Sequence, residues 1–210
     1  MKTMKVLIVA RTRMKGTSRC IGGLAEDGSS VRLLRSTGQY FDTNAPFKVG
    51  QLWELRSYRK PENLVPPHVE DVLVTAQEHI HDEPDPRAYI LKRVAPWRGG
   101  INEIFGGLVG YTSRGNGYVC KRIGLPGRST GFWIPDRDLN LREDGEHYDY
   151  GDDGPPRGLK YVGEPDPPAS IPAGTLVRVS LARWWKPEDA GPDLEERCYL
   201  QLSGWFRACP

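Results

Sequence analysis

The sequence lacks a long apolar run, which argues against a helical membrane span. Its longest apolar stretch near the start covers only residues 6–10, whereas a span needs roughly 18 consecutive apolar residues. No signal-peptide pattern is evident around this stretch. We therefore expect a cytoplasmic protein with no membrane partner.

Cysteine is scarce and scattered. There is no CxxC pair, and no histidine stands at the spacing expected of zinc ligands. The four cysteines are Cys20, Cys120, Cys198 and Cys209. This distribution favours reduced thiols and predicts no metal site.

The motifs of common enzyme families are also missing. A P-loop, GxGxxG, GxSxG and HExxH do not occur in the sequence. Their absence argues against nucleotide hydrolysis and familiar hydrolase chemistry. We expect no cofactor, and a binding role rather than an enzymatic one.

Charge is nearly balanced overall but unevenly distributed along the chain. The net formal charge is +2, yet residues 1–60 carry +8 and residues 91–137 carry +6, while residues 61–90 and 138–210 each carry −6. Two basic segments packed side by side would form a positive face that attracts phosphate backbones. The alternative is that the basic segments pair with the acidic ones.

Short alternating apolar segments bounded by turn residues predict a mainly β protein. The strands expected in the first half cover residues 5–10, 20–24, 30–34, 52–58 and 69–74. A turn at Glu26-Asp27-Gly28 joins two of them as a hairpin. Five short strands in about 75 residues suit a small barrel.

The spacing of apolar residues becomes helical between Asp85 and Val94, where Pro86 suits a helix start. A further helical turn is expected at residues 101–105. Strands resume at residues 108–112, 118–123, 131–135, 159–162, 175–184 and 198–206. We therefore predict two small OB-like β-barrels, residues 1–77 and 107–210, joined by a helical connector at 78–106, with an acidic loop near residues 144–156.

Several segments carry a family resemblance. They are Arg11-Thr12-Arg13, Ser18-x-Cys20-Ile21-Gly22-Gly23-Leu24, Val31-Arg32-Leu33-Leu34, Gly50-x-Leu52-Trp53-Glu54, Pro66-Pro67-His68-Val69-Glu70-Asp71-Val72 and Gly131-Phe132-Trp133-Ile134-Pro135. They resemble the dual OB-containing domain family of prokaryotes, most strongly over residues 5–75. The resemblance implies two OB-like barrels and nucleic-acid sensing in a bacterial defence-type system, with DNA or RNA as ligand and a protein effector encoded nearby as a further partner.

A basic segment after the first predicted strand is our main candidate for binding nucleic acid. Arg11, Arg13, Lys15 and Arg19 stand close to Gly16, and arginine offers a planar fork that matches phosphate oxygens. The alternative is a solvated loop that binds nothing. On the third predicted strand, Arg32 and Arg35 face opposite ways, so one of them is expected to line the same groove; alternatively, Arg32 pairs with Glu54.

Aromatic and basic residues also stand together in the second half, a combination that single-strand binders use for stacking and backbone contact. Tyr111 is close to Arg114, and Trp133 follows Arg128. Tyr111 and Trp133 are the expected exposed platforms. The alternative is that these rings fill the core.

His68, Glu70 and Asp71 place an imidazole and two carboxylates within four residues. They suggest a second hypothesis, a sensor or enzyme that recognises a nucleotide or modified base. A structural role through hydrogen bonds is the alternative for His68 and Asp71. A third hypothesis is a protein-interaction module whose acidic segments dock a basic partner.

Overall fold

The computed structural model describes residues 3–151, 155, 157–188, 191 and 194–208. The strands of the first half are β1 (Met4–Arg13), β2 (Ser18–Ala25), β3 (Ser30–Arg35), β4 (Phe41–Asp42), β5 (Gln51–Arg59) and β6 (Asp71–Asp82). The helical elements are α1 (Pro86–Leu91) and the 3-10 segment η1 (Ile101–Gly107). The strands of the second half are β7 (Trp97–Gly99), β8 (Gly110–Tyr111), β9 (Gly117–Val119), β10 (Thr130–Pro135), β11 (Leu139–Leu141), β12 (His147–Tyr150), β13 (Gly158–Tyr161), β14 (Ser170–Ile171), β15 (Leu176–Leu181) and β16 (Cys198–Phe206).

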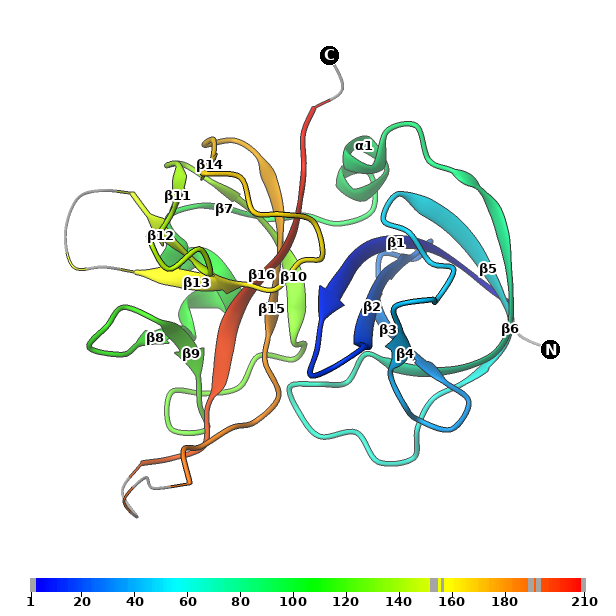
Figure 1. Ribbon diagram of the computed structural model, residues 1–210, viewed down its shortest axis with the longest axis horizontal. Helices are drawn as coiled ribbons and strands as arrows, with labels where there is room; N and C mark the ends of the chain where they lie inside the picture. The colour runs from blue at the N-terminus through cyan, green and yellow to red at the C-terminus, as the bar shows by residue number, and fades with distance from the viewer. Residues whose placement is uncertain (1–2, 152–154, 156, 189–190, 192–193, 209–210) are drawn as a thin grey trace.

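The first half is a closed barrel (Figure 1). Its strands run in the order β1-β5-β6-β3-β2, and β1 pairs with β2 to close the ring, with β4 added at the edge of β2. All the pairs are antiparallel except β3 with β6. The predicted turn is present, because Gly28 adopts a φ of 83° that suits glycine. Five strands closed in this Greek-key order make an OB-like barrel.

The predicted connector helix is present as α1. Asp85 caps it by accepting a hydrogen bond from the Ala88 amide at 2.8 Å, and Pro86 occupies its first turn. Strand β6 continues past residue 77 to Asp82 because its ladder with β5 runs on to Gln51. Strand β7 already pairs with β10 of the second sheet. We propose to place the division between the two units after β6 and before β7.

The second half forms a larger sheet, consistent with a second OB-like unit. Its main path runs β14-β11-β12-β13-β16-β15-β10-β7, and β8 and β9 join it through β16. The structure thus confirms the mainly β, dual OB-like prediction. Three predicted strands are shorter than expected. The strand expected at residues 108–112 spans only Gly110–Tyr111, the next stops at Val119, where the Gly124 amide donates to the Cys120 carbonyl and forms a turn, and the strand expected at residues 175–184 stops at Leu181.

The expected acidic loop is partly wrong. Residues 147–150 form β12, which pairs with β11 and β13 on its two sides. Tyr148 explains the difference, because its buried ring packs into the core of the second unit. Residues 152–154 and 156 of the expected loop lie outside the described residues.

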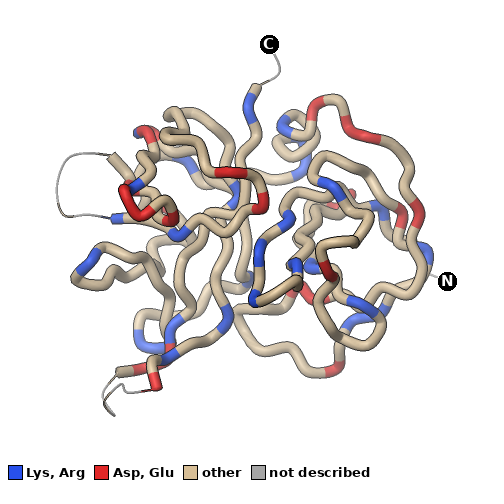
Figure 2. The backbone as a smooth tube through the Cα atoms, viewed as in Figure 1, with Lys and Arg blue, Asp and Glu red and all other residues tan. Residues whose placement is uncertain are grey.

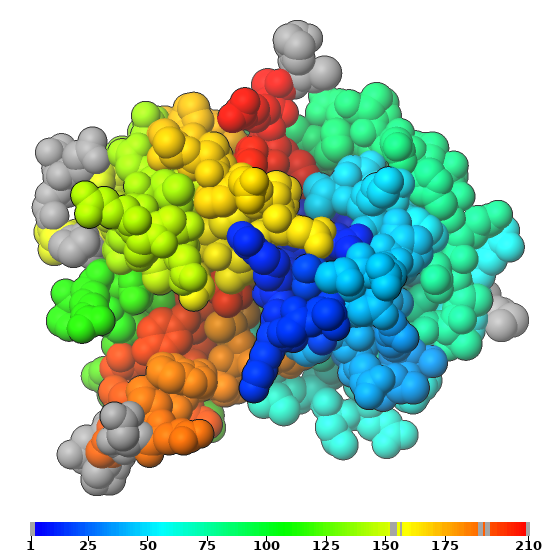
Figure 3. All heavy atoms as spheres, viewed as in Figure 1, coloured from blue at the N-terminus to red at the C-terminus, as the bar shows by residue number. Residues whose placement is uncertain are grey.

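The two units pack directly on each other. An apolar cluster joins Leu7, Val9 and Ile90 with Phe132 and Leu176 of the second unit. Figure 3 shows the N-terminal strands in dark blue against the yellow segment around residue 163, where Thr12 and Gly163 form a β-bridge. Among the described residues, no helix has the length and apolar character needed to cross a membrane.

Candidate functional site

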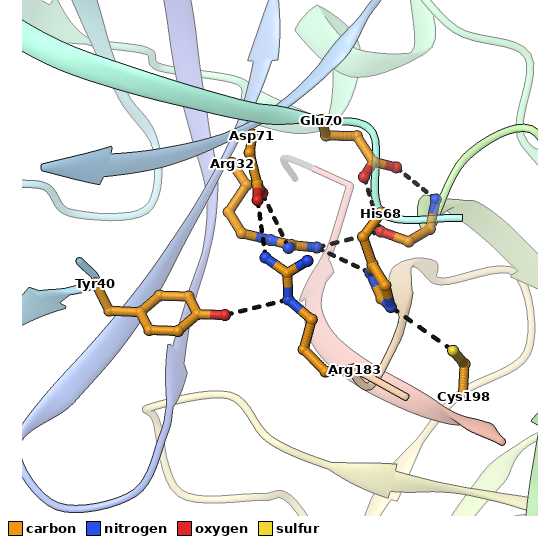
Figure 4. Close-up of polar contacts among 8 residues, drawn as sticks. Arg32, Tyr40, His68, Glu70, Asp71, Arg183 and Cys198 are labelled. Carbon is orange, nitrogen blue, oxygen red and sulfur yellow. Dashed lines mark hydrogen bonds and ion pairs between the residues drawn. The ribbon is translucent and has the colours of Figure 1, made fainter. Parts of the chain in front are cut away.

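A buried polar cluster lies where the two units meet (Figure 4). Arg32 on β3 donates to Asp71 Oδ1 at 3.0 Å, and Arg183, which follows β15, donates to Asp71 Oδ2 at 2.8 Å. The side chain of Asp71 is only 10% exposed. One carboxylate therefore holds a guanidinium from each unit, with Tyr40 accepting a further hydrogen bond from Arg183.

His68 is held neutral in this cluster. Burial, together with the nearby Arg32 and Arg183 charges, lowers the pKa of His68 to about 3. Its Nδ1 accepts from Arg32 Nη2 at 3.3 Å, and its Nε2 lies 3.7 Å from the Sγ of Cys198. The imidazole is thus a neutral acceptor that orients Arg32.

Glu70 points to a different partner. Its carboxylate accepts the backbone N–H and the hydroxyl of Ser129, the latter at 2.8 Å. His68, Glu70 and Asp71 therefore do not share one partner, and none of them lines the cavity at the junction of the two units. Within the described part of the chain, no three His, Cys, Asp or Glu side chains are placed to hold a metal ion. The geometry supports a structural role for these three residues.

A cavity of about 160 Å³ opens beside this cluster, between the units. The first unit contributes residues of β1 and β2, together with Arg32 and Tyr40, and the second contributes residues of β10, β15 and β16. Three guanidiniums line it, those of Arg32, Arg178 and Arg183. In OB folds, the face formed by the second and third strands is the usual ligand surface; here it forms one wall of the cavity.

A wider groove of about 510 Å³ lies next to the cavity, and the two share Ala182 and Gln201 as lining residues. Its walls carry the side chains expected of a site for single strands. They are Arg114, His147, Lys160, Trp185 and Tyr199. Trp185 is 53% exposed, and its ring lies 5.9 Å from that of Tyr199.

The predicted basic loop is mostly not a loop. Arg11 and Arg13 lie on β1 and Arg19 on β2, because the hairpin ladder extends to the Arg13–Arg19 pair; only Lys15 falls in the connection. Arg11 and Arg19 both bind Glu164, with Nε to carboxylate distances of 2.7 and 2.9 Å. These two arginines are therefore engaged within the protein.

Charge pairing also accounts for the arginines of β3. Arg32 pairs with Asp71 and not with Glu54, which pairs with Arg56. Arg35 forms an ion pair with Asp42. Figure 2 shows basic and acidic positions interleaved along both units. Among the first-half candidates, Arg13, Lys15 and Arg35 are exposed. Of these, Arg35 is ion-paired and the Arg13 guanidinium lies 5.9 Å from the Tyr161 ring centre.

The expected aromatic platforms are not exposed. Trp133 is fully buried and donates to the Gly99 carbonyl at 2.9 Å, because β10 lies between β15 and β7 and this face of the strand forms the core. Tyr111 is half-buried, with the Arg157 guanidinium 5.1 Å from its ring centre. Arg128 lies 5.2 Å from the ring centre of Trp97. Arg114 alone of this group lines the groove.

The sequence interpretation missed Arg178, Arg183, Tyr40 and Trp185. One signal was available: in Leu176-Val177-Arg178-Val179-Ser180-Leu181 an arginine interrupts an apolar strand. Alternation puts Arg178 on the face opposite the core residues Val177 and Val179. Such a position demands a specific partner for the charge.

Comparison with known proteins identifies a family. The family model described as a dual OB-containing domain matches residues 4–205, nearly the whole chain. A search of curated proteins gives no match. A search of solved structures gives none either.

Proposed function

Since the chain belongs to the dual OB-containing domain family, we propose that it binds single-stranded DNA or RNA in the groove beside β16. OB folds are in general binders of nucleic acids or other oligomers. Fold alone does not give function, so the proposal depends on the side chains of the groove.

Trp185 is the observation that carries the proposal. Trp185 is 53% exposed, and the backbone holds it in place through paired hydrogen bonds with Arg197 at 3.0 and 2.9 Å. Its ring and that of Tyr199 form an aromatic surface on which bases can stack.

Cations stand beside this surface. Arg114 and Lys160 are exposed in the same groove, and Lys160 pairs with Glu146 at 2.7 Å across the surface. Surface pairs of this kind are weak, so a phosphate replaces Glu146 at small cost. Stacking rings with flanking cations are how proteins bind single strands without strict sequence preference.

We place this binding in a bacterial defence-type system, the setting that the family resemblance implies. A strand held in the groove would be the signal, and a protein effector encoded nearby would respond to it. The base preference and any recognition of modified bases follow from contacts around Trp185.

Binding of fluorescein-labelled oligo(dT) and oligo(rU), measured by anisotropy over a salt series, tests the proposal. We expect binding at low salt that weakens steeply as salt rises, because bound phosphates release counterions. Trp185→Ala should weaken binding roughly 5- to 150-fold, the loss of one stacked base. Arg114→Ala should weaken it and reduce the salt slope by about one unit.

Arg59→Ala is the matched control, because Arg59 is exposed on β5 and lies outside the groove. Its affinity should equal that of the wild type. Absence of binding at low salt, or wild-type affinity in Trp185→Ala, contradicts the proposal.

A further inference from the structure

Arg178 is a buried charge without an ionic partner. It lies in the middle of β15, is only 5% exposed, and turns toward the first unit with its strand neighbours Leu176 and Ser180. Its Nη1 donates to Ser203 Oγ at 2.8 Å. Within the described residues, no carboxylate forms an ion pair with it, whereas Arg32 and Arg11 each have one.

This guanidinium remains charged. Burial lowers the pKa of Arg178 to about 10, which still leaves it protonated at neutral pH. An unpaired buried charge is costly for the folded protein. A buried charge of this kind suits a function that needs it, such as binding an anion.

The cavity wall beside Arg178 also contains a polar atom without a hydrogen-bond partner. Thr130 Oγ1 is buried and has no hydrogen-bond partner, and Thr130 is only 4% exposed. Thr130 and Arg178 line the same cavity, with Arg32 and Arg183. In this region the three positive charges of Arg32, Arg178 and Arg183 exceed the two negative charges of Asp71 and Glu70 by one. Glu70 attracts Arg178 electrostatically but forms no ion pair with it among the described residues.

Gly22 leaves space for the Arg178 guanidinium. A Cβ at residue 22 would lie 2.6 Å from Arg178 Nη2, closer than such atoms approach. The absence of a side chain on β2 lets the guanidinium lie against the strand at the edge of the cavity.

We propose that this cavity binds one phosphate group, with Arg178 as the main cation and Thr130 Oγ1 as an additional hydrogen-bond donor. The arginine fork matches phosphate oxygens. A cavity of about 150 Å³ holds a benzene ring, so the 160 Å³ here takes a phosphate group while an attached nucleoside stays outside. The terminal phosphate of a nucleic-acid strand and the phosphate of a free mononucleotide present the same chemistry. We assign the terminal phosphate of a bound strand, because the groove adjoins the cavity; this assignment rests on the proposed function.

Thermal unfolding with inorganic phosphate tests the site without any oligonucleotide. Phosphate is titrated at constant ionic strength against sodium chloride, with wild type, Arg178→Met and Arg59→Met side by side. A bound ligand raises the melting temperature of the wild type and of Arg59→Met. Arg178→Met should show only the small rise that phosphate gives to proteins in general. An equal rise in all three proteins, or none in the wild type, overturns the proposal.

Arg178→Met is expected to fold, since no carboxylate loses its partner and Ser203 Oγ still donates to the backbone carbonyl of residue 178. Thr130→Val supplies a second variant that leaves every charge in place. The apparent affinity for phosphate, obtained from the rise in melting temperature, should be several-fold lower in this variant. A full wild-type response in Thr130→Val contradicts the assigned donor.

Anisotropy competition identifies the source of the phosphate. In the wild type, an oligonucleotide with a 5′- or 3′-terminal phosphate should bind about tenfold tighter than its hydroxyl-ended form, and Arg178→Met should lose this preference. Protection by inorganic phosphate and mononucleotide without an end preference would assign the site to free phosphate compounds and refute the strand end. Failure of all oligonucleotides to bind, with phosphate protection intact, refutes the proposed function and leaves the phosphate site supported.

Discussion

Arg11 and Arg13 stand two residues apart on β1, and we expect their removal to have opposite consequences. Arg11 donates to the carbonyls of Ala45 and Phe47 at 3.0 and 2.9 Å and to that of Thr43, and it pairs with Glu164. Arg13 is exposed beside the Tyr161 ring. Arg11 is therefore structural, whereas Arg13 is free to contact phosphate.

Breaking a buried ion pair costs about 3–5 kcal/mol. Arg11→Met belongs at the lower end, near 3 kcal/mol, because Glu164 is 34% exposed and keeps Arg19 as a partner. For a chain of this length, that loss lowers the melting temperature by roughly 6–12 °C. Arg13→Met loses one cation–π contact, about 0.5–1 kcal/mol, or less than roughly 4 °C.

Urea and thermal unfolding of both variants, with oligonucleotide binding measured on the same samples, test whether Arg11 is structural and Arg13 contacts phosphate. Arg13→Met should keep its stability and lose about one unit of salt slope, while Arg11→Met should lose stability and keep the slope. If Arg11→Met melts like Arg13→Met, the ion pair with Glu164 contributes little and our reasoning about Arg11 is refuted.

Three further expectations concern the junction between the units. Thr130→Val should raise the free energy of unfolding by about 1 kcal/mol in phosphate-free buffer, because it removes a buried hydroxyl without a partner; urea midpoints measure this, and a loss of stability would contradict it. The pKa of His68 is about 3 in the folded protein against 6.5 in the unfolded chain, so unfolding takes up a proton below about pH 6.5. The free energy of unfolding should therefore fall by up to about 1.4 kcal/mol per pH unit as the pH drops toward 3. The fall should be less steep in His68→Gln, and an identical pH dependence would refute the assignment. Gly22→Ala should weaken phosphate protection by displacing Arg178, with a smaller loss of stability than Gly23→Ala, whose Cβ would lie 2.2 Å from Val6 Cγ1; a larger loss in Gly22→Ala would count against this role for Gly22.

Local patterns predicted most of the fold. Alternation identified β1, β2, β3, β5, β10 and β16, and Asp85 with Pro86 marked the start of α1. Strand β12 escaped because its charged sequence between acidic, Gly-rich neighbours hides the single core residue Tyr148. Short edge strands such as β4 and β14 contain two residues each, too few to show a period.

The candidate site was harder to predict, because its contacts join residues far apart in the chain. Arg19 and Glu164 are separated by 145 positions, and Arg183 and Asp71 by 112. No local spacing reveals such pairs, so basic residues that form internal ion pairs look like a binding loop. Trp133 was predicted to be exposed for a related reason. Which face of β10 is buried becomes clear only when its neighbours β7 and β15 are known.

Asp71 and Glu164 each connect the two units: Asp71 of the first unit binds Arg183 of the second as well as Arg32 of its own, and Glu164 of the second unit binds Arg11 and Arg19 of the first. The cavity at the junction has walls from both OB-like units, so residues of both are needed to form it. We expect a ligand in it to contact both halves of the chain, so that its binding free energy adds to the stability of their packing. We therefore expect occupancy of the cavity and the mutual orientation of the units to depend on each other.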